Sequence, residues 1–295
     1  MDIPPKFNVL GVGVHALRFA QARELVLGQA RERRGGYVCF CDANSISCAR
    51  RDPAHRAALA GAFLVTPDGM PLVWLGRRAA NKNMTAPVER VYGPDLMLAL
   101  CEAGVGASAG VGADASVSVG TGADAGVGAG VGADAGADGS GLTHFFHGGG
   151  EGTAELLAKK LSARFPGLRV AGVKTPPFRE LDMAEMAVLA ARINMLKPHF
   201  LWVGLGTPKQ EKFMTQFAPR IATSGTVMLG VGAAFDFLSG RVKQAPRWMR
   251  RGGLEWFYRL CAEPRRLAPR YFKNNPLFAA RVLAQVTGLK KYPME

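Results

Sequence analysis

The sequence predicts a layered α/β fold built around a mostly parallel sheet, and three observations lead to this prediction. The chain has 295 residues, 48% of them hydrophobic, which suffices for the core of one large domain or two small ones. Short apolar runs alternate with segments whose apolar residues recur every three or four positions. Several runs end in glycine-rich or polar turns, as strands of a Rossmann-like sheet do at the edge where ligands bind.

Six apolar runs are expected to form the strands. In chain order they span residues 37–44, 62–69, 143–150, 168–173, 200–206 and 226–232. Between them, "ELLAKKLSARF" (155–165) and "MAEMAVLAARINML" (183–196) have the apolar spacing of amphipathic helices. These elements indicate an α/β domain over residues 1–240 and a separate basic, helical appendage over residues 241–295.

Residues 104–141 interrupt the pattern with a low-complexity stretch of Gly, Ala, Val, Ser and Asp. The segment "VGADA" occurs there at 111–115 and again at 131–135. With no Leu, Ile or aromatic residue before Leu142, the stretch buries too little apolar surface to offset the entropy of ordering it. We therefore expect a flexible insertion.

The last 55 residues carry most of the positive charge. They hold 13 Lys and Arg against three Glu, a net of +10 out of +14 for the chain. Arginines alternate with Trp, Phe, Tyr and Leu in "APRWMRRGGLEWFYRL" (245–260). This composition suits an anionic membrane surface, RNA, or a substrate diphosphate that the tail covers. A solvated charged face is the plain alternative.

The composition also argues against several classes of protein. The five cysteines form no CxxC pair, which indicates reduced cytosolic thiols. No HxxxH, HExxH or Asp-x-Asp pattern occurs, so no metal site is expected. Neither a signal-peptide pattern nor a run of 18 apolar residues is present, which predicts a protein that is neither secreted nor membrane-spanning.

Asp68 stands in "LVTPDGMPLVW" (64–74), where an apolar run breaks and resumes. Pro67, Asp68 and Gly69 have the composition of a β-turn, in which proline presets φ, aspartate bonds its own backbone and glycine accepts positive φ. The alternative is a carboxylate held out for chemistry. Composition by itself favours the turn.

A second candidate site is "LWVGLGTPKQEKFM" (201–214), a strand, a glycine turn and a helix start. Thr207 is expected to be the N-cap, Pro208 the first helical residue, and Gln210 the partner in a capping box. The same helix start would place Lys209, Gln210 and free backbone donors where a diphosphate or a sugar hydroxyl is held.

Three further segments leave two interpretations open. Gly148 and Gly149 begin a glycine loop before a helix, which suits either a phosphate or a tight turn. Asp236, between two phenylalanines, is expected to meet a backbone donor or an arginine, and a structural role is favoured over binding. Arg90 suits bidentate phosphate binding or a plain surface position.

Eight blocks in order connect these segments: "DANS", "TPDGMPLVW", "RVYGPDLM", "FFHGG", "LWVGLGTPKQE", "GVGAAFDFLSG", "GLEWFYRL" and "EPRRLAPRY". Together they resemble the WecG/TagA/CpsF glycosyltransferases, over nearly the whole chain apart from residues 104–140. The resemblance implies inverting, metal-independent transfer of a sugar from a UDP-sugar to a polyprenyl-diphosphate-linked sugar, without a cofactor. Family members supply N-acetylmannosamine, its uronic acid or glucose at the cytoplasmic face of the plasma membrane.

The resemblance also implies roles for individual residues. Asp68 matches the proposed catalytic base, while Asn44, Arg90 and Gln210 match the substrate-binding positions. Asp42 departs from the family, which has a threonine there. The arginine-rich appendage that closes the site and touches the membrane corresponds to residues from about Arg241, and we expect Arg259, Arg265 and Arg266 in it to contact diphosphates.

Two other function classes compete with this interpretation. A nicotinamide-dependent oxidoreductase would be α/β, but the only early glycine pattern is the GxG of "VLGVGVHAL" (9–17), short of GxGxxG. A non-catalytic RNA-binding protein would account for the basic aromatic tail, but not for polar turns gathered at strand ends. We therefore favour the transferase, with no nucleic-acid partner.

Overall fold

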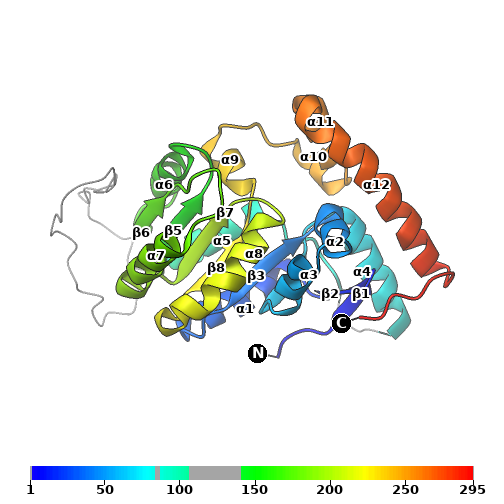
Figure 1. Cartoon of the computed structure of the whole chain (residues 1–295), viewed down its shortest axis with the longest axis horizontal. Coiled ribbons are helices and arrows are strands. Elements are labelled where there is room, and N and C mark those ends of the chain that lie inside the picture. The colour runs from blue at the N-terminus through cyan, green and yellow to red at the C-terminus, as the bar shows by residue number, and fades with distance from the viewer. Residues whose placement is uncertain (1, 84–86, 106–140, 295) are drawn as a thin grey trace.

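The computed structural model describes residues 2–83, 87–105 and 141–294, which form an α/β fold (Figure 1). A six-stranded sheet lies at its centre in the order β4-β3-β8-β7-β5-β6, and all neighbouring strands are parallel. The strands are β3 Tyr37–Cys41, β4 Leu64–Pro67, β5 Thr143–Gly148, β6 Arg169–Lys174, β7 Phe200–Gly204 and β8 Val227–Gly230. All six predicted strands are present, and the predicted Rossmann-like layered fold is confirmed.

Helices cover both faces of the sheet (Figure 1). One face carries α1 Phe19–Arg31, α5 Gly93–Gly104, α6 Thr153–Arg164 and α9 Ala234–Ser239. The other carries α2 Ala43–Ala49, α3 Pro53–Ala60, α7 Met183–Leu196, α8 Lys209–Phe217 and the 3₁₀ helix η1 Ala218–Ser224. Along β7, Phe200 and Trp202 pack against the face that carries α1, α5, α6 and α9. Leu201 and Val203 pack against the opposite face, as the two-residue period of a strand requires. A strand buried on both faces reads as a continuous apolar run, which is why the pattern was visible in the sequence.

Most of the predicted insertion, residues 106–140, lies outside the described residues. Its two ends lie together, because Val105 and Gly141 form an antiparallel bridge and the N–H of Leu142 donates to the carbonyl of Gly104 over 3.0 Å. The α/β core therefore continues from α5 into β5 across a closed junction.

A two-stranded antiparallel hairpin, β1 Lys6–Val9 and β2 Val12–His15, precedes the sheet. The GxG of residues 11–13 belongs to this hairpin. Its turn residues Leu10 and Gly11 have φ of 53° and 94°, the positive values that a type I′ turn needs at both central positions. Sequence patterns predicted no hairpin, because leucine stands where Asn or Asp is the usual signal.

Three helices follow α9: α10 Arg247–Arg251, α11 Glu255–Ala262 and α12 Pro264–Val286. They confirm that the basic tail is helical. The long helix α12 buries Leu267, Tyr271, Asn274 and Phe278, at the three- and four-residue spacing of one helix face, and it packs on α2. The division of the chain into two domains at residue 240 stays a prediction.

The tail ends on the N-terminal hairpin (Figure 1). The amide of Asn8 donates to the carbonyl of Tyr292 over 2.6 Å, and the side chain of Gln285 accepts from the N–H of Leu10 over 2.9 Å. The tail thus leaves the α/β core at α9 and returns to it at β1.

Candidate active site

A cleft of about 1440 Å³ lies at the carboxyl ends of the strands. Residues that follow each of the six strands line it: Asp42, Asp68, Gly149, Pro176, Gly206 and Gly232. Helix α4 Met70–Asn83 and the tail helices α11 and α12 supply further lining residues. This is the edge where open α/β sheets bind ligands.

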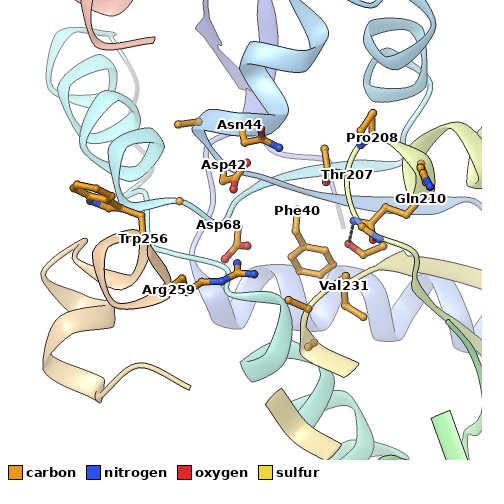
Figure 2. A pocket seen from close by; sticks show the side chains of 18 of the residues that line it. Phe40, Asp42, Asn44, Asp68, Thr207, Pro208, Gln210, Val231, Trp256 and Arg259 are labelled. Atoms are coloured by element: carbon orange, nitrogen blue, oxygen red, sulfur yellow. Dashed lines mark hydrogen bonds between the residues drawn. The ribbon is translucent and has the colours of Figure 1, made fainter. Parts of the chain in front are cut away.

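Asp68 lies at the junction of β4 and α4 and points into the cleft (Figure 2). The backbone N–H groups of Asp68 and Gly69 both donate to the carbonyl of Cys41, over 2.9 and 3.1 Å, which ties the junction to β3. The predicted positive φ at Gly69 is wrong. A Cβ there would lie 3.1 Å from the Cα and Cβ of Asp42, so glycine is favoured by the close approach of β3 and β4.

The Asp68 carboxylate retains 23% of its exposure and lies 3.5 Å from Nη2 of Arg90. The Nε of Arg90 also donates to the backbone carbonyl of Asp68. Burial raises the pKa of Asp68 to about 7; Arg90 opposes the rise, and the carboxylates of Glu255, Asp42 and Asp95 add to it. A carboxyl that titrates near neutrality is well matched to accept a proton at physiological pH.

Glu255, the first residue of α11, brings the tail into this site. It accepts from Nη2 of Arg90 and from the hydroxyl of Tyr92, each over 2.8 Å. Tyr92 in turn accepts from Gln244 over 2.8 Å, and Nη1 of Arg90 donates to the carbonyl of Arg250 over 3.1 Å. Sequence reasoning missed Glu255 and Tyr92. The available signal was a lone acid within the basic block "RRGGLEWFYRL".

Asp42 and Asn44 begin α2 beside Asp68 (Figure 2). Oδ1 of Asp42 accepts from the N–H of Ser45 over 2.8 Å, so Asp42 is the N-cap of α2. The family has threonine at this position, and threonine is also a common N-cap residue. The change to Asp42 therefore preserves the capping role. Asn44 accepts from Nδ2 of Asn274 over 3.3 Å, a contact between α2 and α12.

The predicted capping box at the start of α8 is wrong. Helix α8 has Pro208 as its N-cap and no side-chain capping bond. The hydroxyl of Thr207 instead donates to Glu211 over 2.8 Å, because that buried carboxylate requires donors. Gln210 donates to the carbonyl of Gly230 over 2.7 Å and accepts from the N–H of Gly206 over 3.2 Å, and thereby joins the β7 turn to the end of β8.

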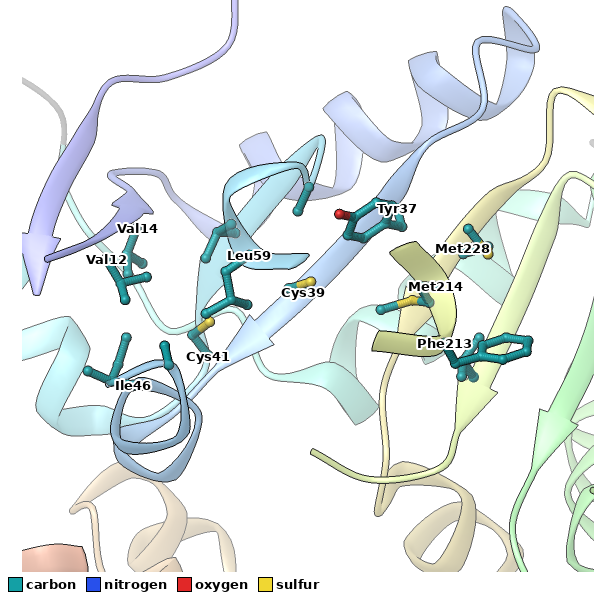
Figure 3. Close-up of a cluster of buried hydrophobic side chains, with 14 of the residues drawn as sticks. Val12, Val14, Tyr37, Cys39, Cys41, Ile46, Leu59, Phe213, Met214 and Met228 are labelled. Atoms are coloured by element: carbon teal, nitrogen blue, oxygen red, sulfur yellow. The ribbon is translucent and has the colours of Figure 1, made fainter. Parts of the chain in front are cut away.

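Glu211 belongs to a buried polar chain beneath the cleft. Its Oε2 lies 3.8 Å from Nδ1 of His55, whose Nε2 lies 3.2 Å from the hydroxyl of Ser45. Burial raises the pKa of Glu211 to about 7 and lowers the pKa of His55. Around this chain, apolar side chains of β3, α2, α3 and α8 form a packed floor that includes Cys39, Ile46, Leu59 and Met214 (Figure 3).

Gly148 and Gly149 join β5 to β7. Gly148 is buried with φ of 145°, and a Cβ there would lie 2.5 Å from the backbone of Gly204. The N–H of Gly149 donates to the carbonyl of Gly204 over 3.0 Å. Close strand packing accounts for Gly148. Gly149 lines the cleft, but its φ of 73° and the approach of Thr153, whose Cβ would lie 2.7 Å from an added Cβ, already favour glycine there.

The remaining predicted residues divide between the cleft and the surface. Lys209, Asp236 and Arg259 line the cleft, and the Arg259 guanidinium lies 5.5 Å from the ring of Phe237. Figure 2 shows its side chain pointing toward Asp68. Arg265 is exposed, and the side chain of Arg266 lies outside the described part of the structure.

Comparison with known proteins supplies the family. A model of the glycosyl transferase WecG/TagA/CpsF family matches residues 7–115 and 133–292. The chain belongs to this family. The predicted family is thus confirmed, and with it the α/β enzyme class of glycosyltransferases.

Two named relatives of this WecG/TagA/CpsF protein are both described as N-acetylglucosaminyldiphosphoundecaprenol N-acetyl-beta-D-mannosaminyltransferase. The one from Bacillus subtilis is 32% identical over 148 residues, which cover 50% of this chain and 54% of the relative. The one from Bacillus spizizenii is 25% identical over 236 residues, which cover 80% of this chain and 74% of the relative. These comparisons lend no support to the oxidoreductase or the RNA-binding protein.

The described residues of this family member contain neither a cluster of metal ligands nor a helix that could span a membrane. No three His, Cys, Asp or Glu side chains within residues 2–83, 87–105 and 141–294 come together as metal ligands. None of the helices described over those ranges is long and apolar enough to cross a membrane.

Proposed function

We propose that this chain is an inverting glycosyltransferase that moves a sugar from a UDP-sugar to a polyprenyl-diphosphate-linked sugar. The observation that carries the proposal is Asp68, a carboxyl with a pKa of about 7 at the strand edge of a large cleft. Direct displacement needs one base at the acceptor hydroxyl and positive charge for the leaving UDP. It needs no covalent nucleophile.

Asp68 is the base in this proposal. It takes the proton of the acceptor hydroxyl while that oxygen attacks the anomeric carbon of the donor sugar. The bond between the anomeric carbon and the phosphate oxygen of UDP breaks, and UDP leaves from the opposite face, which inverts the configuration. Arg259, which lines the cleft and points toward Asp68, offsets the negative charge on a diphosphate.

We assign the donor to the part of the cleft beside β5, β7 and β8. Thr207, Lys209, Gln210, Gly149 and Asp236 line that part. Lys209 supplies positive charge at the start of α8. Because both ends of the Gln210 amide already bond the protein, we assign Gln210 to holding the β7 turn in place, with Thr207 held by Glu211.

The names of the relatives give the substrates to test first. Both relatives are named for transfer of N-acetylmannosamine to N-acetylglucosaminyl-diphosphoundecaprenol. We propose the same class of acceptor for this chain, and UDP-N-acetylmannosamine as the first donor. The corresponding uronic acid and glucose are the other donors that the family resemblance implies.

We also propose that the tail contacts the inner face of the plasma membrane. Trp248 on α10 and Phe257 on α11 are exposed and do not line the cleft, and they lie within a segment of net charge +10. Aromatic and arginine side chains together suit the interface of an anionic membrane. Co-sedimentation with vesicles should therefore require anionic lipid and weaken as salt rises.

The proposed activity is tested by a screen of UDP-sugars with a synthetic polyprenyl-diphosphate N-acetylglucosamine acceptor. Transfer of one sugar with inverted anomeric configuration supports the proposal. The rival functions are tested in parallel by thermal unfolding, since a ligand that binds the native state raises the unfolding temperature. Stabilisation by NAD with none by UDP, or tight salt-sensitive RNA binding with no effect of UDP, would overturn it.

A further inference from the structure

One part of the cleft is apolar and lies apart from the donor side. Its two walls are α4 and α12, which contribute Met70, Trp74 and Leu75 from one side and Phe278, Val282 and Val286 from the other. Among the α4 and α12 side chains described as lining the cleft, Arg78 alone carries a charge. We call this part the α4/α12 groove.

The spacing along α12 makes the groove wall continuous. Phe278, Val282 and Val286 follow each other at four-residue intervals, which places them on one stripe of the helix. Eight residues of α-helix rise about 12 Å. Phe278 is buried, whereas Val282 and Val286 are half-buried, so the groove runs from the interior of the cleft toward the surface.

The groove begins at the proposed base. Met70 lies two residues after Asp68, at the first turn of α4, and both residues line the same cleft. On the other side of Asp68 the lining is mixed, with Lys209, Gln210 and Asp236 beside apolar residues such as Leu205 and Phe213. The α4 and α12 side is the more uniformly apolar one, so a molecule bound with its reactive hydroxyl at Asp68 can extend hydrocarbon along it, where transfer from water is favourable.

This inference rests on the proposed function. The acceptor carries a sugar, a diphosphate and a polyprenyl chain in that order, so its chemistry changes from polar to apolar along its length. The cleft offers a matching lining for each part: the Asp68 carboxyl, the Arg259 guanidinium that points toward it, and the apolar side chains of the α4/α12 groove. The groove includes Leu283, which lines the cleft and is exposed, and from there the rest of the polyprenyl chain can continue into a membrane.

We infer that the α4/α12 groove binds the first isoprene units of the polyprenyl-diphosphate acceptor, between Trp74 and Leu75 on α4 and Val282 on α12. The groove is a lipid subsite within the protein, distinct from the exposed aromatic surface of the tail. It fixes the direction of the acceptor, so that the sugar hydroxyl reaches Asp68.

A pair of acceptors and a pair of variants test the groove. Val282→Asn places an amide in it, while Leu277→Asn makes the same kind of change on the same helix at a position that does not line the cleft. The acceptors are N-acetylglucosamine diphosphates carrying undecaprenyl or butyl. We expect Val282→Asn to raise the KM for the undecaprenyl acceptor roughly tenfold and to leave the butyl acceptor unchanged. Leu277→Asn should change neither KM in detergent micelles.

The assignment of the groove to the isoprene units would be overturned if Val282→Asn changed the KM equally for both acceptors. It would also be overturned if the two variants had the same KM for the undecaprenyl acceptor. A second measurement does not need turnover. A polyprenyl diphosphate with a photoreactive group in its first isoprene units should label peptides of α4 and α12, and Val282→Asn should reduce that labelling. Labelling of α4 and α12 without transfer would refute the proposed function but support lipid binding in the groove. Transfer with labelling elsewhere would refute lipid binding in the groove but support the proposed function.

Discussion

Nη2 of Arg90 donates to the carboxylate of Glu255 across 2.8 Å, and these residues are 165 positions apart in the chain. Arg90 belongs to the α/β core and Glu255 to the basic tail. The same Nη2 lies 3.5 Å from Asp68, so one guanidinium stands between two carboxylates. The charge state of Asp68 therefore depends on whether the tail is in place.

Glu255→Gln is expected to shift the pH profile of the enzyme to lower pH. Glu255 raises the pKa of Asp68, which burial brings to about 7. A base must be deprotonated to act, so kcat/KM should rise with pH through that value. Glutamine keeps one acceptor oxygen for Arg90 and carries no charge, so the acidic limb should move down by about one pH unit or less.

The matched control for this shift is Glu102→Gln, an exposed acid on α5. Its pH profile should coincide with that of the unmodified enzyme. An acidic limb that stays in place in Glu255→Gln, or moves to higher pH, contradicts the assigned electrostatic role of Glu255.

Asp68→Asn should remove transfer without removing donor binding. The amide cannot take the acceptor proton, so kcat should fall on the order of 10²- to 10⁴-fold. The increase in unfolding temperature caused by UDP should persist, because Lys209, which we assign to the donor, lies on α8. Near-normal turnover in Asp68→Asn would refute the base assignment, and loss of the UDP effect would place Asp68 in donor binding instead.

Most of the strands were predictable from sequence because they are short, apolar and buried on both faces, as "FLWVG" in β7 is. The order of the strands was not, since β3 pairs on one side with β4, the next strand in sequence, and on the other with β8, the last. Asp68 was predictable because the turn composition and the family motif that identify it both lie in one contiguous segment of the sequence. Glu255 was not, because its role comes from a contact with Arg90 that only the folded chain creates.

The capping box failed for a related physical reason. Thr207 and Gln210 have the correct spacing for mutual capping, but Glu211 is buried and draws the Thr207 hydroxyl to itself. A buried carboxylate costs more when unsatisfied than an exposed helix end does. The local sequence pattern thus predicted where the helix starts, whereas the hydrogen bonds at its start depend on the buried carboxylate of Glu211.

His147→Phe is expected to make the protein less sensitive to acid. His147 is buried, its ring centroid lies 5.1 Å from that of Phe213, and burial lowers its pKa to about 4. Between pH 6.5 and 4 the unfolded chain binds a proton at this position and the folded chain does not. The free energy of unfolding therefore falls as pH falls, by about 1.4 kcal/mol per pH unit.

The other four histidines also have lowered pKa values, so the unmodified protein should lose stability steeply below pH 6.5. Asp68 and Glu211 act in the opposite direction, since their raised pKa values favour the folded state as pH falls below about 7. Urea unfolding at several pH values should show a shallower loss in His147→Phe. Parallel curves for the two proteins would contradict this account.

Asn274→Ala should loosen α12 from α2 while the sheet stays folded. Asn274 is buried, accepts from Nη1 of Arg51 over 2.9 Å and donates to Asn44 over 3.3 Å. The exposed Arg51 and the half-buried Asn44 can turn to water when these bonds are removed, so the cost is the net value of about 0.5–1.5 kcal/mol for each hydrogen bond. Since these bonds hold α12, one wall of the cleft, against α2, amide hydrogen exchange should rise along α12 and remain unchanged in β3, β7 and β8.

Asn275→Ala, one position away and only half-buried, should leave exchange in α12 near its original rate. Equal exchange in the two variants would show that the hydrogen bonds of Asn274 do not hold α12 in place, and faster exchange throughout the sheet would show that α12 and the core unfold together.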